Sequence, residues 1–370
     1  MARSIDPRFR RSSAGASGNV MDRRTAALGL MAACAVAGDV AGETAGAPAA
    51  VPQNAAWSSW AARFLGADGR VIDDQAGGIS HSEGQGYGLL LAQAHGDKTA
   101  FRGIEDWTTA NLQVRQDHLM AWRWHVNGAV RAMDWHSATD GDVFRAWALL
   151  RAGRATGCSD WVARAVAIAR DIDALCIAPD PRAQQLPILR PGAEARMTAD
   201  RVLFNPSYIM PRALRALGTA AGTPRLIAAA DHGERLIADL AGQGAVPDWI
   251  DVTEQGFDAP REHDLRSGYD ALRLPLYLIW SGQGRHPGVA RGLETLQRAR
   301  APGHLAVVTD ADGAVTAESD QPGYLSIAAL ARCRPRPVTP TDAAGQSYYP
   351  ATLQLLAQVA AREQDACETL

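Results

Sequence analysis

The chain has 370 residues, of which 47% are hydrophobic and 21% charged, and its formal net charge at pH 7 is −3. This composition is that of a globular protein able to bury one large core or two small ones. A mildly acidic chain makes a poor nucleic-acid binder, so we expect no nucleic-acid partner and regard a neutral polymer as the better candidate ligand.

The first fifty residues differ in composition from the rest of the chain. Arg23 and Arg24 precede an apolar stretch at 26–37, and small residues follow it at 45–49. This order is typical of an export signal, and the stretch is too short to span a bilayer. We therefore predict an export signal and flexible N-terminal segment at 1–50, a single domain at 51–370, and a periplasmic or secreted protein without stable membrane insertion. A twin-arginine route and lipid attachment at Cys34 stay open.

The five cysteines form no CxxC pair, and no histidine lies near them at the spacing of metal ligands. We therefore expect neither a structural zinc site nor any other metal or cofactor. One disulfide is compatible with an oxidising compartment, but the sequence does not fix its pairing.

Beyond residue 50 the apolar residues recur at helical spacing, and almost no segment has the pattern of a strand. Six predicted helices are apolar nearly all round, as buried helices are: 83–94, 140–152, 205–217, 268–280, 322–331 and 347–359. Others are amphipathic and lie between them in the chain: 100–112, 161–175, 225–240 and 289–298. We therefore predict an all-α fold in which outer helices surround a closed ring of inner ones. The fifth and sixth inner helices leave little room for an outer helix between them.

Acidic residues stand at the starts of three of the predicted inner helices. Glu83 lies among small and glycine residues at 80–88, Asp140 lies in the segment 139–142, and Asp270 lies in the segment 268–271. Glycines near a helix start leave room for a bulky ligand to approach a carboxyl group. Three acids at three helix starts predict one shared cleft.

The tyrosines follow the same division. All seven fall in the predicted inner helices, most of them near the N-terminal end: residues 87, 208, 269, 277, 324, 348 and 349. If the inner helices run parallel, these ends meet on one face and line a single groove. A tyrosine offers a flat apolar ring and a hydroxyl group, which suits sugar rings. Packing in the core is the alternative for each single tyrosine.

An ordered set of motifs between residues 57 and 360 resembles glycoside hydrolase family 8. The matching strings are 68–73 (DGRVID), 82–88 (SEGQGYG), 121–124 (AWRW), 137–142 (SATDGD), 204–208 (FNPSY), 247–249 (PDW) and 269–273 (YDALR). Within the family the chain is most similar to the periplasmic endoglucanases encoded with bacterial cellulose synthases. No single string is strong evidence, but seven in family order are specific.

The resemblance implies an (α/α)6 barrel and inverting hydrolysis of internal β-1,4 bonds in cellulose-type β-glucan. By the same resemblance Glu83 is the general acid, Asp270 is the general base, and Asp140 binds the sugar ring at the cleavage point. It also implies a role in cellulose biosynthesis, with β-1,4-glucan as substrate and a cellulose-synthase complex as partner.

Physical arguments lead to expectations for each acid. Burial should keep Glu83 protonated, whereas Asp270 must be ionised to accept a proton from water. Inversion needs roughly 6.5–9.5 Å between the two carboxyl groups, so that a water molecule fits. An N-cap role is the alternative for Asp140, and it is compatible with sugar binding. We expect Asp142 to be structural.

Further residues are expected around the acids. Tyr87, Tyr208, Tyr269 and Arg273 are candidate substrate-binding residues. Arg273 lies one turn after Asp270 and could also keep it ionised. Tyr269 could hydrogen-bond the attacking water or Asp270.

Three tryptophans, at 122, 124 and 135, lie in an irregular segment that we expect to form one wall of the groove, with Trp122 and Trp124 as candidate sugar contacts. At least one should stack on a glucosyl unit, with core packing as the alternative. His81 and His136 depart from the family pattern, and we expect structural roles for them, with an effect on the acid as the alternative.

Three rival functions stay open. A hydrolase of the same family acting on chitosan or xylan would use the same catalytic residues, but chitosan amines would call for extra acids along the groove. A non-catalytic glycan-binding protein would not need both Glu83 and Asp270. A polysaccharide lyase would need basic residues in the cleft to bind a uronate substrate, which the acidic motifs disfavour.

Overall fold

The computed structural model describes residues 55–126, 128, 130–131, 134–334 and 345–364, all of which belong to one compact unit. The predicted export signal at 1–50 lies outside the described residues. Among the described residues, no helix combines the length and the hydrophobicity needed to cross a bilayer.

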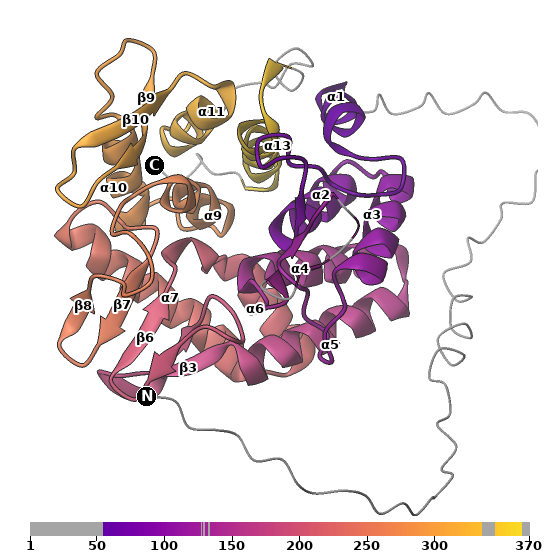
Figure 1. The fold of residues 1–370 in the computed structure, drawn as a ribbon, viewed down its shortest axis with the longest axis horizontal. Coiled ribbons are helices and arrows are strands. Elements are labelled where there is room, and N and C mark those ends of the chain that lie inside the picture. The colour runs from indigo at the N-terminus through magenta and orange to yellow at the C-terminus, as the bar shows by residue number, and fades with distance from the viewer. Residues whose placement is uncertain (1–54, 127, 129, 132–133, 335–344, 365–370) are drawn as a thin grey trace, which may run out of the picture. The chain divides into compact units, whose positions relative to one another are not determined.

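The predicted ring of inner helices is confirmed. It is formed by α2 (Ser82–Ala94), α4 (Thr139–Thr156), α6 (Pro211–Ala221), α9 (Leu274–Trp280), α11 (Pro322–Ala331) and α13 (Tyr348–Glu363). Each of these helices contacts the next, and α13 contacts α2, so the ring closes (Figure 1). A short helix, η3 (Pro206–Tyr208), precedes α6, and α8 (Tyr269–Leu272) precedes α9.

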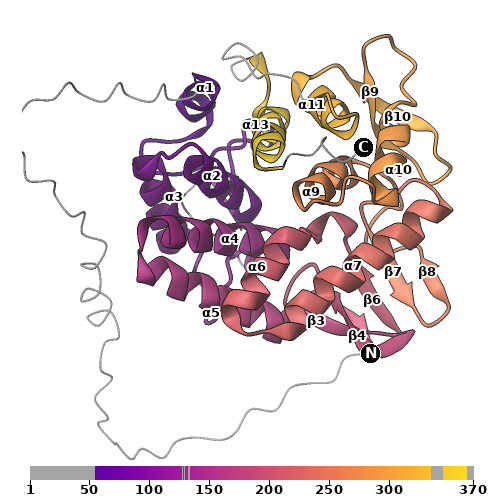
Figure 2. The same ribbon diagram turned by 180° about the vertical axis from the view of Figure 1, so that it is seen from behind.

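The predicted outer helices are also present. They are α3 (Lys98–Asn111), α5 (Ser159–Leu175), α7 (Pro224–Gln243) and α10 (Pro287–Leu296). Each packs against the inner helix that precedes it in the chain, as in an (α/α)6 barrel, and together they lie around the outside of the ring (Figure 2). Most of the short interval between the fifth and sixth inner helices, residues 335–344, lies outside the described residues.

Helix α1 (Ala55–Phe64) was not among the predicted helices. It packs against α13 where the first and last inner helices meet. Trp60 is fully buried there, and its indole N–H donates to the Thr352 hydroxyl at 2.9 Å. Ten residues with two tryptophans and one phenylalanine give a short helix enough apolar surface to dock.

The expectation that the chain has almost no strand was wrong. The structure contains β1 (Ser80–His81), β2 (Arg123–Trp124), β3 (Ile177–Asp180), β4 (Ala183–Leu189), β5 (Met197–Thr198), β6 (Arg201–Phe204), β7 (Ile250–Thr253), β8 (Gly256–Asp258), β9 (Leu305–Thr309) and β10 (Val315–Ser319). They form antiparallel pairs β1–β2, β3–β4 and β9–β10 and the sheet β5–β6–β7–β8. Each described strand lies in a segment that leads into an inner helix, so the strands build up the face where inner helices begin. Several of these strands have only two to four residues, and the longer β4 and β9 are not buried at alternate positions, so the sequence does not show a period of two.

The glycines near Glu83 serve helix packing and do not clear space for a ligand, which corrects the sequence interpretation. A Cβ atom on Gly86 would lie 2.8 Å from Phe144 Cβ, and one on Gly141 would lie 2.6 Å from the Ser82 carbonyl carbon and 2.7 Å from the Glu83 nitrogen. Contacts this short leave no room for a methyl group. The starts of α2 and α4 therefore touch backbone to backbone, which brings Glu83 and Asp140 together.

Candidate active site

Arg273, directly after α8, is the centre of the candidate site. It is 1% exposed, and its Nη1 donates to Glu83 Oε2, while its Nη2 lies 3.0 Å from both Asp140 Oδ2 and Asp270 Oδ1. The three acids come from α2, α4 and α8, so the structure brings together the three helix starts singled out in the sequence. One guanidinium group with five N–H donors can serve several carboxylates at once.

The buried guanidinium group is held by further polar side chains. Its Nε and Nη2 donate to Ser207 Oγ at 3.2 and 3.1 Å, and its Nη1 donates to the Tyr87 hydroxyl at 3.1 Å. Tyr87 in turn shares a hydrogen bond with the Tyr277 hydroxyl. A buried charge is stable only when it is paired and hydrogen-bonded, and these contacts meet that requirement.

Glu83 and Asp140 hydrogen-bond to each other, which requires that the pair hold a proton. Burial opposes ionisation of Glu83, but the Arg273 and His81 charges and the Asp140 hydrogen bond outweigh it, so the pKa of Glu83 lies below its usual value. Burial and then the Glu83 charge raise the pKa of Asp140 well above its usual range. These opposite pKa directions run against the expectation that Glu83 is itself the protonated acid in the substrate-free protein, because Arg273 favours the charged form of Glu83.

Asp270 is the most accessible of the three acids, with a side chain 27% exposed against 17% for Glu83 and 2% for Asp140. Burial raises the pKa of Asp270 to about 6, although Arg273 and a hydrogen bond from Asn205 oppose this shift. Asn205 Nδ2 donates to Asp270 Oδ2 at 3.2 Å. Asp270 is therefore ionised above about pH 6 and can accept a proton there.

Asp248 holds the short helix that carries Asp270. Its Oδ1 accepts from the backbone N–H groups of Gly268 at 2.8 Å and Ala271 at 2.9 Å. On the other side, the Tyr349 hydroxyl donates to the Tyr269 carbonyl at 2.7 Å. Neither Asn205 nor Asp248 was predicted as a site residue, although both lie in the family motifs at 204–208 and 247–249.

Several residues near the acids have structural roles. Asp142 accepts from the backbone N–H of Met120 at 2.8 Å, in agreement with the expected structural role. His81 caps α2, since its Nδ1 accepts from Gly84 N at 3.0 Å. Asp140 does not cap α4, because Ala138 occupies the N-cap position. His136 is exposed and packs against Trp122.

The predicted tyrosine contacts separate into buried and accessible ones. Tyr87 is 0% exposed and contacts Arg273, so it is not accessible for the expected contact with substrate. Arg273, also expected to bind substrate, is likewise buried and holds the three acids. Tyr208 is 9% exposed, and its ring centre lies 5.9 Å from the Arg273 guanidinium carbon. Tyr269 is 45% exposed beside Asp270 and is free to meet a ligand.

A cavity of about 520 Å³ lies next to Tyr208, and we call it the aromatic cleft. Its aromatic lining residues are Trp122, His136, Tyr208, Trp249 and His263. The rings of Trp249 and His263 stack at 4.1 Å with an angle of 9° between them. Ser137 and Ala138, which line the cleft, lead directly into Asp140. Flat rings beside an acidic centre suit a chain of sugar units.

Trp124 does not line the aromatic cleft. Its ring packs edge-to-face on Trp107 at 5.4 Å and borders a different cavity, together with Trp135. Trp122 and Trp124 therefore line different cavities. Among the described residues, no cluster of three or more His, Cys, Asp or Glu side chains is arranged to hold a metal ion.

Comparison with known proteins identifies the family. The model of glycosyl hydrolases family 8 matches residues 19–363. The chain is 34% identical over 317 residues to a probable endoglucanase of Novacetimonas hansenii, a match that covers 83% of this chain and 90% of that protein. A family 8 endoglucanase structure from Klebsiella pneumoniae matches with a TM-score of 0.76 and 26% identity, over 84% of this chain and 100% of that one. The structure of an endo-β-1,4-glucanase from Acetobacter xylinum matches with a TM-score of 0.70 and 31% identity, over 84% of this chain and 99% of that one. The chain belongs to glycosyl hydrolase family 8 and is therefore a glycoside hydrolase.

Proposed function

We propose that the protein is an inverting endo-β-1,4-glucanase that cleaves internal bonds of cellulose-type β-glucan. The observation that carries this proposal is the arrangement around Arg273, where Glu83 and Asp270 lie on different nitrogens of one guanidinium group and Asp140 lies beside them. Two carboxyl groups held apart by a cation, with a third acid of raised pKa beside one of them, provide the groups that acid and base catalysis of glycoside hydrolysis require.

In the proposed reaction Glu83 gives a proton to the glycosidic oxygen while Asp270 takes one from water. The water oxygen attacks the anomeric carbon as the bond to the leaving oxygen breaks, so the product has the α configuration. Asp140, which is only 2% exposed, supplies the proton through its hydrogen bond to Glu83, so the expected direct contact of Asp140 with the sugar ring is not part of this proposal. The positive charge of Arg273 offsets the negative charge of the acids and so stabilises them in a partly buried site.

The lining of the aromatic cleft supports a neutral substrate. Two acids border the cleft, but Arg115 pairs with Glu194 at 2.7 Å and Arg196 pairs with Glu262 at 2.9 Å. Acids that are already paired leave little free negative charge for the amines of chitosan. The names of the relatives, endoglucanase among them, favour glucan over xylan.

The acid assignment is tested with Glu83→Gln. Hydrolysis of carboxymethyl cellulose should fall by roughly 10²–10⁴-fold, the usual contribution of a catalytic acid. Cello-oligosaccharide binding, measured by calorimetry, should stay within a few-fold of the parent protein. Retained hydrolysis would refute the assignment. The surface variant Leu175→Ala, on α5, is the matched control and should keep full activity.

Inversion at the anomeric carbon is tested by NMR of freshly released sugar. An inverting enzyme releases the α-anomer from a β-linked glucan, before mutarotation mixes the two forms. If the β-anomer accumulates first, the inverting arrangement is wrong. Parallel assays on β-glucan, chitosan and xylan decide the substrate class.

We also propose that the enzyme acts outside the cytoplasm. The predicted export signal at 1–50 and the family resemblance support a periplasmic or secreted enzyme that trims glucan chains during cellulose synthesis, beside the synthase complex. The test is to fractionate cells that express the full chain and to determine the N-terminus of the exported form by mass spectrometry. An uncleaved protein confined to the cytoplasm would contradict it.

A further inference from the structure

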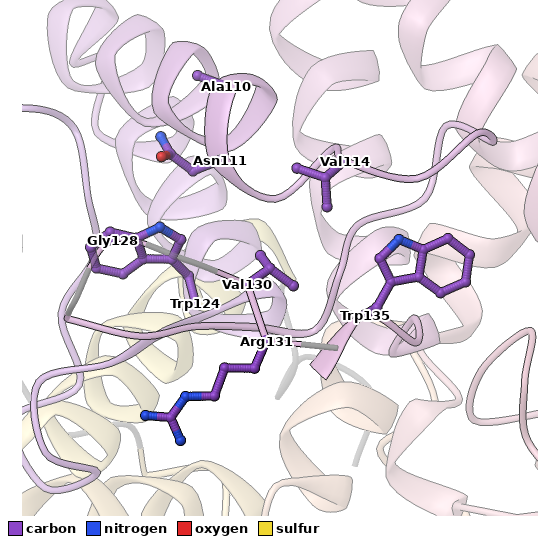
Figure 3. A pocket seen from close by; sticks show the side chains of 8 residues that line it. All are labelled: Ala110, Asn111, Val114, Trp124, Gly128, Val130, Arg131 and Trp135. Carbon is purple, nitrogen blue, oxygen red and sulfur yellow. The ribbon is translucent and has the colours of Figure 1, made fainter. Parts of the chain in front are cut away.

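We propose that the cavity bordered by Trp124 and Trp135 is a second binding site for β-1,4-glucan, separate from the aromatic cleft. This inference rests on the proposed function for the class of ligand. We call it the tryptophan cavity; it measures about 520 Å³. Its lining residues are Ala110, Asn111, Val114, Trp124, Gly128, Val130, Arg131 and Trp135 (Figure 3).

The apolar part of the cavity is exposed to solvent. Figure 3 shows Trp124 and Trp135 on opposite sides of the cavity, with Val114 and Val130 between them. Trp135 is 41% exposed and Val114 is 47% exposed. Large apolar side chains that stay in water and gather in one place mark a binding surface. Indole rings are also among the best platforms for the apolar faces of sugar rings.

Both indole rings are held in place before any ligand arrives. The Arg115 guanidinium carbon lies 4.4 Å from the Trp135 ring centre, and Arg115 also donates to the Trp135 carbonyl at 3.0 Å. Trp124 is held by Trp107 and by Arg70, whose guanidinium carbon lies 5.1 Å from its ring centre. Rings that are already fixed lose little freedom when a ligand stacks on them.

The polar lining suits hydroxyl groups. Asn111 donates to the Trp107 carbonyl at 2.9 Å, which fixes its side chain and leaves an amide oxygen as acceptor. Arg131 is exposed and supplies N–H donors. No carboxylate is among the described residues that line the cavity, so a cationic ligand is disfavoured. A flat, neutral, hydroxyl-rich chain matches this lining.

The position of the tryptophan cavity links it to the catalytic centre. Trp135 borders this cavity, whereas the next residues, His136 to Ala138, border the aromatic cleft and lead into Asp140. The two cavities are therefore bordered by adjacent residues of one short segment. Glucan held at the second site stays close to the cleft, which raises its local concentration there. Only a polymer long enough to reach both sites gains from this.

Two variants test the site. Trp135→Ala removes one indole platform, and Val114→Asp places a carboxylate in the cavity at an exposed position. In the inactive Glu83→Gln background, each should weaken binding to amorphous cellulose by roughly tenfold, Trp135→Ala because one stacking contact is lost and Val114→Asp because a charged group enters the apolar lining. In the active enzyme, each should keep kcat/KM for cellopentaose within about twofold of the parent, since the short substrate fills only the cleft.

The matched control is Leu175→Ala, an exposed apolar residue at the end of α5, which should change neither quantity. Unchanged binding to cellulose in both variants would overturn the second site. An equal loss with cellopentaose would also overturn it, because the cavity would then be part of the cleft. A parent enzyme that neither binds nor hydrolyses β-glucan would instead refute the proposed function, and the site with it.

Discussion

The two sides of the catalytic centre are built differently. Glu83 and Asp140 lie at the starts of two inner helices, α2 and α4, whose backbones touch at Gly141. Asp270 lies in α8, a helix of only four residues that side-chain hydrogen bonds hold in place. The acid side is thus positioned by packing, and the base side by polar contacts. In the proposed mechanism the attacking water enters beside Asp270, whose side chain is the most exposed of the three acids.

This difference predicts which substitutions harm each side. The base side should be sensitive to the loss of a hydrogen-bonding group, and the acid side to the gain of a methyl group. Either change would move a carboxyl group relative to Arg273, and misplacement by about 1 Å can cost roughly 100-fold in rate.

The largest effect is expected from Asp248→Ala on the base side. It leaves the N–H groups of Gly268 and Ala271 without their acceptor and frees α8 to move. We expect kcat/KM on carboxymethyl cellulose to fall by roughly 100-fold and the free energy of unfolding to fall by about 1–3 kcal/mol. Steady-state kinetics and urea unfolding measure the two effects.

The control for this variant is Arg266→Ala. Arg266 also contacts Asp248, at 3.4 Å, but its side chain is 50% exposed. Loss of such an exposed pair should cost less than about 1 kcal/mol and leave kcat/KM nearly unchanged. If both variants lose activity equally, the backbone contacts of Asp248 are not what holds Asp270.

A smaller effect is expected from Gly141→Ala on the acid side. The new methyl group would lie 2.6 Å from the Ser82 carbonyl carbon, so α2 and α4 must separate. Such overpacking costs about 1–3 kcal/mol of stability. We expect kcat/KM to fall by roughly tenfold as Glu83 shifts away from Asp140 and Arg273.

Gly242→Ala on α7 is the matched control, since nothing lies within 4 Å of its added methyl group. An alanine in a helix is favoured over glycine by up to about 1 kcal/mol, so this variant should be as stable as the parent or slightly more so. Equal stability of the two variants would contradict the close packing of α2 and α4.

The sequence predicted the ring because inner helices are covered on all sides and must be apolar all round. Leu89, Leu90 and Leu91 show this pattern, since each of them is buried on a different face of α2. The same reasoning placed Glu83, Asp140 and Asp270 at helix starts that converge in the structure. Helix α1 was missed because its partner α13 lies almost three hundred residues away in the chain, as the hydrogen bond from Trp60 to Thr352 shows.

The protonation of the site could not be read from the sequence. It depends on the Arg273 charge beside Glu83 and on Asp140 being less accessible to water than Glu83. Spacing along the chain carries no information about either property. The role of Asp248 was hidden for a similar reason, because its partners lie twenty residues away across a loop and a strand pair.

The smallest effect should come from Asn205→Ser and should appear only in the pH profile. Asp270 must be ionised to act as a base, and its pKa is raised to about 6, so kcat/KM should fall as the pH drops through about 6. The Asn205 amide stabilises the carboxylate, so its loss raises the pKa further and moves this acidic limb to higher pH, by about 0.5–1 unit. Serine can still cap η3 in place of the Asn205 carboxamide oxygen, which keeps the fold intact. An acidic limb that stays in place, or moves to lower pH, while the thermal unfolding midpoint is unchanged would show that Asp270 is not the group that must lose a proton.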